Sequence, residues 1–253
     1  MSAVRLPVCG REVTLALPTG CEDLLLLEAP VLDTSLALAL LGRLAGPAGD
    51  WGALCVPDLD ALVLRLRQLV FGDLLRAEAV CPAAGCGRRF DVSFAVEDYL
   101  ASQEPAAPED VEPDPESSWY RLRESGVRFR LPTGADQAAV AREADPEGEL
   151  ARRCIQPADA APEVLQRVEA AMALLAPPLS RALDGACPEC GAAVELAFDA
   201  QRFCLRELRD QAAFLLEDVV VLAARFHWSE EAILALPRRR RLRYVELVRQ
   251  QGE

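Results

Sequence analysis

The sequence predicts an α+β fold of two related units, each a small β-hairpin packed with helices, followed by a C-terminal helical extension. Three observations predict this fold. The segment Leu-Pro-Thr-Gly occurs twice, and a Cys-Gly segment that ends in Phe also occurs twice, in the same order. Such duplication is typical of two similar structural units. Short runs of alternating polarity lie next to longer runs with apolar residues at helical spacing, which predicts strands beside helices.

The composition limits the classes of protein that fit. With 253 residues and 51% hydrophobic residues, the chain has material for a sizeable core in one large or two ordinary domains. No stretch approaches the roughly 20 apolar residues of a membrane span, and the first residues lack a secretory signal, so we expect a cytoplasmic protein with no membrane partner. The net charge of −13 argues against a general polyanion binder.

The first unit is expected over residues 1–101. A strand over 13–17 leads into its Leu-Pro-Thr-Gly turn, where Thr19 has a suitable side chain to cap the next helix. A further helix is predicted over Leu59–Val70, with Asp58 as its N-cap. Another strand then leads into the first Cys-Gly segment.

An acidic, proline-rich linker is expected over 102–118, because it carries four prolines and no basic residue. Such a segment buries too little apolar surface to offset its ordering entropy, which predicts mobility. The second unit is expected over 119–226. There Thr133 repeats the capping position, a helix is predicted over Pro162–Leu175, and one long helix over Gln201–Phe226.

The helical extension is expected over 227–253, where Ser229 caps a short helix and Pro237 begins the last one. This last helix carries the densest basic cluster of the chain, which we expect to bind a partner: Arg238, Arg239, Arg240, Arg241 and Arg243. Three interpretations stay open for it, namely docking to an acidic protein surface, contact with nucleic acid, and a solvated helix face.

Two cysteine pairs carry the clearest chemistry. Cys81 and Cys86 begin the first duplicated segment, and Cys187 and Cys190 begin the second. Paired cysteines before a strand form a metal-binding turn, and two such turns supply the four thiolates of a closed structural zinc site. In a reducing compartment, metal binding is favoured over disulfides. We expect one shared zinc; the alternatives are a metal held by one pair with other ligands, and free thiols without metal.

The remaining residues give no catalytic constellation. The chain has a single histidine, His227, which we expect to be a packed aromatic beside Trp228. No glycine-rich phosphate loop is present, and a metal ringed by four cysteines has no open position for water. A metal-dependent hydrolase is therefore disfavoured, and no small-molecule substrate is expected. The other cysteines are expected to be small core residues: Cys9, Cys21, Cys55, Cys154 and Cys204.

Taken in order, four segments resemble the T-even phage family of baseplate hub assembly proteins, which has relatives in phage tails and contractile injection systems. They are the Leu-Pro-Thr-Gly turn at Leu131–Gly134, the hairpin Cys187–Phe198, the helical region Gln201–Phe226 and the stretch His227–Val248. The first cysteine pair departs from the pattern, because four residues separate its members in place of two.

The resemblance implies a non-enzymatic protein that helps the hub of a contractile-tail baseplate to assemble. Its partners would be the hub or other tail proteins, and the protein itself could become part of a phage-like particle. The alternative is a nucleic-acid-binding zinc-ribbon regulator that uses the cluster Arg238–Arg243, which the acidic net charge disfavours.

Overall fold

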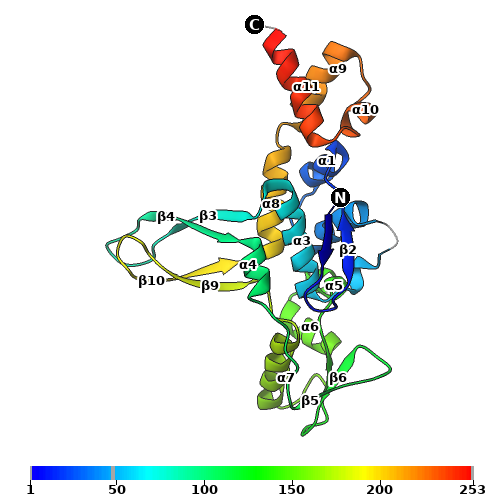
Figure 1. Ribbon diagram of the computed structural model, residues 1–253. Helices are drawn as coiled ribbons and strands as arrows, with labels where there is room; N and C mark the ends of the chain where they lie inside the picture. The colour runs from blue at the N-terminus through cyan, green and yellow to red at the C-terminus, as the bar shows by residue number, and fades with distance from the viewer. Residues whose placement is uncertain (1, 47–48, 252–253) are drawn as a thin grey trace.

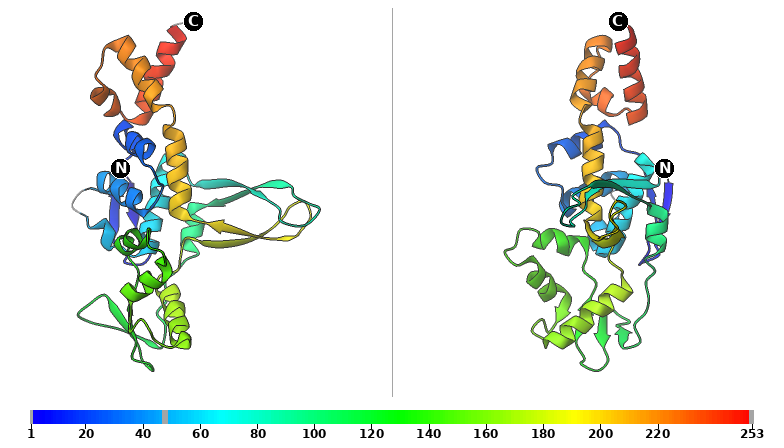
Figure 2. Two further views of the ribbon diagram at one scale, coloured as in Figure 1. Left: turned by 180° about the vertical axis from the view of Figure 1, so that it is seen from behind. Right: turned by 90° about the vertical axis from the view of Figure 1, so that its left-hand side faces the viewer.

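The computed structural model describes residues 2–46 and 49–251 and has the mixed α+β architecture that the sequence predicts. The molecule is elongated and roughly cross-shaped (Figure 1). A helical body occupies the centre, an arm of two β-hairpins projects sideways, a smaller α+β unit lies below, and a helical unit lies above. The two views in Figure 2 show the same four parts, with the arm standing clear of the body.

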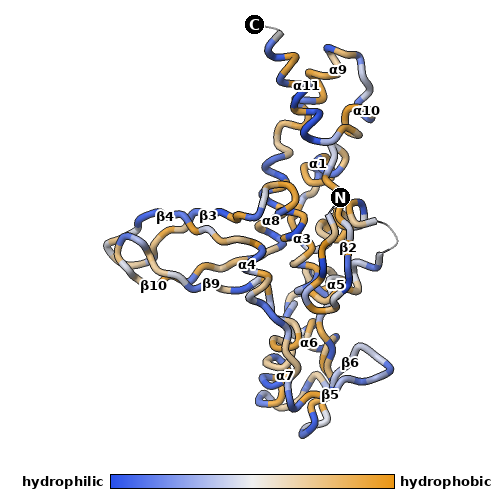
Figure 3. The backbone as a smooth tube through the Cα atoms, in the orientation of Figure 1, coloured by the Kyte–Doolittle hydropathy of each residue, from blue (hydrophilic) through white to orange (hydrophobic). Residues whose placement is uncertain are grey.

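The central body holds the largest hydrophobic core, in which leucines of the first half predominate. Figure 3 shows hydrophobic stretches along these helices. Six buried residues of this core come from the second half of the chain, so the core draws on both expected units: Leu179, Phe198, Ala200, Cys204, Leu205 and Leu208. Its elements are β1 (Ser2–Arg5), β2 (Glu12–Leu15), α1 (Gly20–Glu28), α2 (Thr34–Leu44), η1 (Trp51–Ala53), α3 (Val56–Phe71), α4 (Val96–Ala101) and α8 (Ala200–Ala212).

Each of the two hairpins of the arm is an antiparallel strand pair. β3 (Leu74–Val80) pairs with β4 (Arg89–Ala95), and β9 (Arg181–Ala186) pairs with β10 (Ala193–Phe198). The hairpins run side by side and meet at the tip (Figures 1 and 2). At the base of the arm, the rings of Phe94, Tyr99 and Phe198 lie 5.1 to 5.7 Å apart between centroids, which anchors both hairpins to the body.

The lower unit has its own small core, in which Phe129, Leu122 and Val168 are fully buried. Four short strands form its sheet in the order β5-β6-β7-β8, with α6 and α7 beside it, whereas α5 packs against α6 and also against α2, α3 and η1 of the central body. Its elements are β5 (Val111–Pro113), β6 (Trp119–Leu122), β7 (Arg128–Arg130), α5 (Gly134–Val140), α6 (Pro146–Cys154), β8 (Ile155–Gln156) and α7 (Pro162–Leu175). The helix predicted over Pro162–Leu175 is confirmed at both ends.

The acidic segment 102–118 differs from the mobile linker that its composition predicts. It supplies β5, and Val111 of that strand is 8% exposed in the core of the lower unit. Asp110 forms an ion pair with Arg167 of α7, and Asp114 forms one with Arg128. The segment is therefore held in a defined position by the buried side chain of Val111, by the pairing of β5 with β6 and by these two ion pairs.

The upper unit comprises α9 (Leu215–Phe226), α10 (Glu230–Leu234) and α11 (Arg238–Gln251). The single helix predicted over Gln201–Phe226 is wrong, because the chain leaves helical geometry between α8 and α9, around Phe214. The apolar stripe continues through this break and neither Gly nor Pro marks it, so the sequence carries no signal for it. Ser229 caps α10, as predicted.

The two Leu-Pro-Thr-Gly turns have the predicted capping role. Thr19 caps α1 and Thr133 caps α5, each in a capping box with an acid three residues later. The prediction for Asp58 is wrong. It lies inside the first turn of α3, is fully buried, and accepts hydrogen bonds from the backbone of Val8 and Cys9. It thereby fixes the loop between β1 and β2, while Cys55 occupies the N-cap position.

Candidate metal centre

The four predicted metal ligands come together at the tip of the arm. The Sγ atoms of Cys81 and Cys190 lie 3.7 Å apart, and those of Cys86 and Cys187 lie 3.9 Å apart. All four sulfur atoms lie within 4.8 Å of one another. In each of these two close pairs, one cysteine belongs to the first hairpin and the other to the second, so the cluster links the two hairpins to each other.

Tight turns present these sulfur atoms. The backbone N–H of Cys81 donates to the carbonyl of Arg88, and that of Cys187 donates to the carbonyl of Ala192, each at 2.9 Å. These bonds close both turns in the same way. The residue after the second cysteine of each pair is a glycine with positive φ, a geometry that a side chain would strain. The longer spacing of the first pair therefore still gives a turn equivalent to the second.

The environment of the sulfur atoms is mostly apolar. Cys81 and Cys187 are 3% and 2% exposed and pack with Val194 in a small cluster, whereas Cys190 is exposed. Burial opposes ionisation of Cys187, but the backbone amides of Cys190 and Glu189 lower the pKa of this thiol to about 7. The Ala83 amide favours the Cys81 thiolate, yet burial and the neighbouring thiols raise the pKa of Cys81 to about 12.

These opposite shifts have a simple chemical meaning. Four crowded sulfurs cannot all ionise without a cation between them, because thiolates repel one another. A metal ion supplies that charge, and its binding releases the thiol protons. Four thiolates fill a tetrahedral coordination sphere and leave no position for water or substrate. The cluster can therefore hold a metal ion that braces the two hairpins.

The other cysteines only partly follow the prediction of small core residues. Cys154 and Cys204 are fully buried and belong to the two large cores. Cys55 is half-buried, and Cys9 and Cys21 are exposed, so the prediction is wrong for the last two. Cys21 occupies the first turn of α1, where the capping box needs only its backbone N–H.

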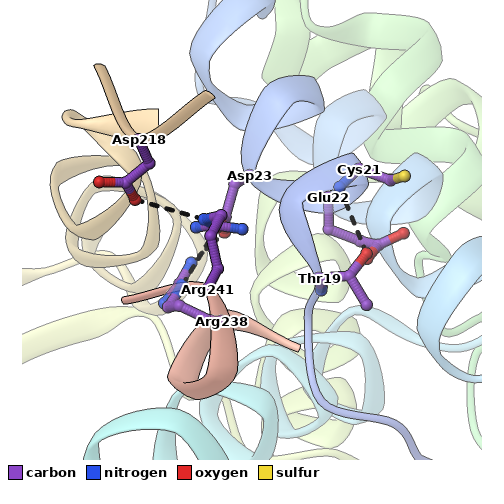
Figure 4. A network of polar contacts seen from close by, with 7 residues as sticks. All are labelled: Thr19, Cys21, Glu22, Asp23, Asp218, Arg238 and Arg241. Carbon is purple, nitrogen blue, oxygen red and sulfur yellow. Dashed lines mark hydrogen bonds and ion pairs between the residues drawn. The ribbon is translucent and has the colours of Figure 1, made fainter. Parts of the chain in front are cut away.

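The predicted partner-binding arginines divide into internal and external residues. Arg241 is 1% exposed and forms ion pairs with Asp23 of α1 and Asp218 of α9 (Figure 4). Arg238 also forms an ion pair with Asp23, which is itself fully buried. These two arginines hold the upper unit against α1 and are not available to a partner, which corrects the prediction for them. The sequence gives no sign of this, because both acids lie far from α11 along the chain.

The other three arginines of the cluster, Arg239, Arg240 and Arg243, are exposed. Arg243 forms a surface ion pair with Glu246. His227 is exposed too, at the left-handed C-cap of α9, so the packed aromatic expected there is not found.

Sequence reasoning also missed a buried acid in the central body. Asp60 of α3 is 1% exposed, and burial raises the pKa of its carboxyl group to about 6. The sequence does carry a signal for it, because Asp60 stands among the apolar residues of the helix predicted over Leu59–Val70. Burying a carboxylate without a charged partner is costly, so an acid at such a position points to a special role.

Among residues 2–46 and 49–251, no helix combines the length and the apolar character that crossing a membrane requires. Comparisons with known protein families, with curated protein sequences and with solved structures found no match to this chain.

Proposed function

We propose that the four-cysteine cluster at the tip of the arm holds a structural zinc ion. In a tetrahedral site with Zn–S bonds of about 2.3 Å, neighbouring sulfur atoms lie about 3.8 Å apart. The Cys81–Cys190 and Cys86–Cys187 sulfur distances of 3.7 and 3.9 Å agree with that value. Four soft thiolate ligands also favour zinc over the hard cations calcium and magnesium. Metal analysis of the purified protein should find about one zinc per chain; protein that stays folded without metal would contradict this.

The role of the protein follows as a second proposal: a non-enzymatic assembly factor or structural component of a phage-like contractile-tail baseplate, with hub or other tail proteins as its partners. One observation supports it most. Four cysteines cluster on a projecting arm, and a metal held by all four would have no free coordination position for chemistry and would stiffen the arm instead. A rigid projection suits assembly with other proteins. The ordered motifs from Leu131 to Val248 add the family resemblance.

The upper unit offers a surface for such a partner. Arg239 and Arg240 are exposed on α11, next to the internal ion pairs that fix this helix. On a chain with a net charge of −13, a local basic patch favours an acidic protein surface, because electrostatic complementarity selects partners.

The test uses cells that produce the contractile particle. The gene is replaced by one that encodes Cys190→Ser or Cys21→Ser, the latter changing an exposed cysteine outside the cluster. We expect Cys190→Ser to lower the fraction of tails that carry a complete baseplate in electron micrographs, and Cys21→Ser to leave it unchanged. Normal baseplates after complete deletion of the gene would refute the proposed role.

A nucleic-acid-binding regulator remains the second candidate, and the exposed Arg239 and Arg240 are the observation in its favour. Phosphate contacts make binding strongly dependent on salt. Duplex DNA binding that weakens with salt and disappears in the double variant Arg239→Ala, Arg240→Ala would support the regulator and count against the baseplate role.

A further inference from the structure

A cavity of about 290 Å³ lies where the central body meets the lower unit. Its walls are mostly apolar and come from four separate segments. Pro57 belongs to α3, Pro132 to the second Leu-Pro-Thr-Gly turn, Leu150 to α6 and Met172 to α7. Clefts between two packed units are common positions for ligand sites. None of the four clustered cysteines lines this cavity, so it is separate from the candidate metal centre.

One buried carboxyl group lines the cavity. Asp60 accepts a hydrogen bond from Ser180 Oγ at 2.9 Å and another from Gln201 Nε2 at 2.6 Å. The Gln201 side chain is itself fixed, because its Oε1 accepts from Thr34 and its Nε2 also donates to Gln137. The carboxylate is therefore held in one orientation before any ligand arrives.

The charge of this carboxylate has no cationic partner. Both of its hydrogen-bond donors are neutral, and none of the ion pairs in the described part of the chain includes Asp60. The nearby charge of Asp199 is negative and acts against ionisation. An asparagine could serve as a purely structural link here without the cost of burying a charge. A buried acid without a cation, lining a cavity, is typical of a binding site.

We propose that this cavity binds an organic cation of the alkylammonium or alkylguanidinium class, with its apolar stem between Pro132 and Met172 and its charged head at Asp60. The volume is at the lower limit for ligand pockets, so the occupant is small. A free amine has this chemistry, and so does one Lys or Arg side chain of a partner. The surplus of acidic residues attracts either of them.

Met172 provides the measurement, since the chain contains only one other methionine, Met1. In protein labelled with carbon-13 at the methionine methyl groups, n-butylguanidinium should shift the Met172 resonance saturably. The neutral analogue 1-butanol should shift it at least tenfold less at the same concentration. In Asp60→Asn, the affinity for n-butylguanidinium should fall more than tenfold, while the wild-type circular dichroism spectrum shows that the variant is folded.

A second variant tests the cavity without touching the acid. Ala173 is exposed and lines the cavity, so Ala173→Phe should block entry and abolish the shift. A short peptide with a central Arg, compared with the same peptide carrying Gln, distinguishes a partner's side chain from a free amine. Equal shifts from 1-butanol and n-butylguanidinium, or undiminished binding by Asp60→Asn, would overturn the proposal. So would the absence of any shift from both the small cation and the Arg peptide.

Discussion

Replacing an exposed cysteine should reveal whether the arm is braced by metal. Cys190 and Cys21 are both exposed, so burial alone predicts that a change to Ser costs each less than about 0.5 kcal/mol. A metal ion held by the cluster would raise the stability cost of replacing Cys190 and leave the cost of replacing Cys21 unchanged. Its sulfur lies 3.7 Å from that of Cys81, and a shared ion would join two positions 109 residues apart.

The size of the effect follows from the length of the closed loop. A crosslink over a loop of about 100 residues removes roughly 4.7 kcal/mol of chain entropy from the unfolded state. The tip has little else to hold it, since only Cys81, Cys187 and Val194 are buried there. In zinc-loaded protein we therefore expect Cys190→Ser to lower the free energy of unfolding by about 4 kcal/mol and Cys21→Ser to leave it unchanged.

Urea unfolding of both variants measures this difference, and amide hydrogen exchange shows where it arises. In Cys190→Ser, the protection of backbone amides from exchange should fall in the four strands of the arm and persist in α3 and α8. A chelator should reproduce the loss in the wild type and have no further effect on Cys190→Ser. Equal stability of the two variants, within about 0.5 kcal/mol, would refute the metal brace.

Three further changes test other parts of the fold. Because the pKa of Asp60 is raised to about 6, its contribution to stability is complete below pH 4 and is lost as the pH rises through 6. Urea unfolding should therefore show Asp60→Asn gaining about 2 kcal/mol over the wild type between pH 4 and pH 7, and a constant difference would contradict this. Arg241→Met should cost about 3 kcal/mol and expose the upper unit to limited proteolysis, whereas the exposed Arg239→Met should not. Gly134→Ala should lower the melting temperature, because the new Cβ would lie 2.7 Å from the Leu59 side chain. Gly42→Ala is the control: Gly42 lies within α2 and a Cβ there would meet no other atom within 4 Å, so alanine should stabilise the helix by about 1 kcal/mol and raise the melting temperature.

The parts of the fold that the sequence predicts are those fixed by local chemistry. Thr19 and Thr133 cap helices because a hydroxyl group at that position satisfies a free backbone N–H wherever the turn occurs. Cys187 and Cys190 are similarly informative, because a short spacing and a glycine define a tight turn. Duplication then predicts that the two cysteine pairs meet, since equivalent hairpins can pair with each other.

The parts that the sequence does not predict depend on contacts between distant residues. Arg241 looks like any other member of a basic helix face until Asp23 and Asp218 are brought beside it. Val111 is one apolar residue in an acidic segment, and only the strand beside it explains its burial. The break at Phe214 leaves the apolar period intact, so no local rule detects it.

The two Leu-Pro-Thr-Gly turns show how the lower and upper units are joined to the central body. Thr133 forms a backbone bridge with Cys55, directly before α3, and Thr19 forms one with Pro237, directly before α11. Each turn thus docks against the start of a helix from another part of the chain. The glycine after each threonine leaves no room for a side chain, because a Cβ on Gly20 or Gly134 would lie within 2.8 Å of its neighbours. The repeated motif therefore acts as a connector: the second copy attaches the lower unit to the body, and the first attaches the upper unit to α1. This gives a physical reason for a glycine in both copies that a local turn alone does not require.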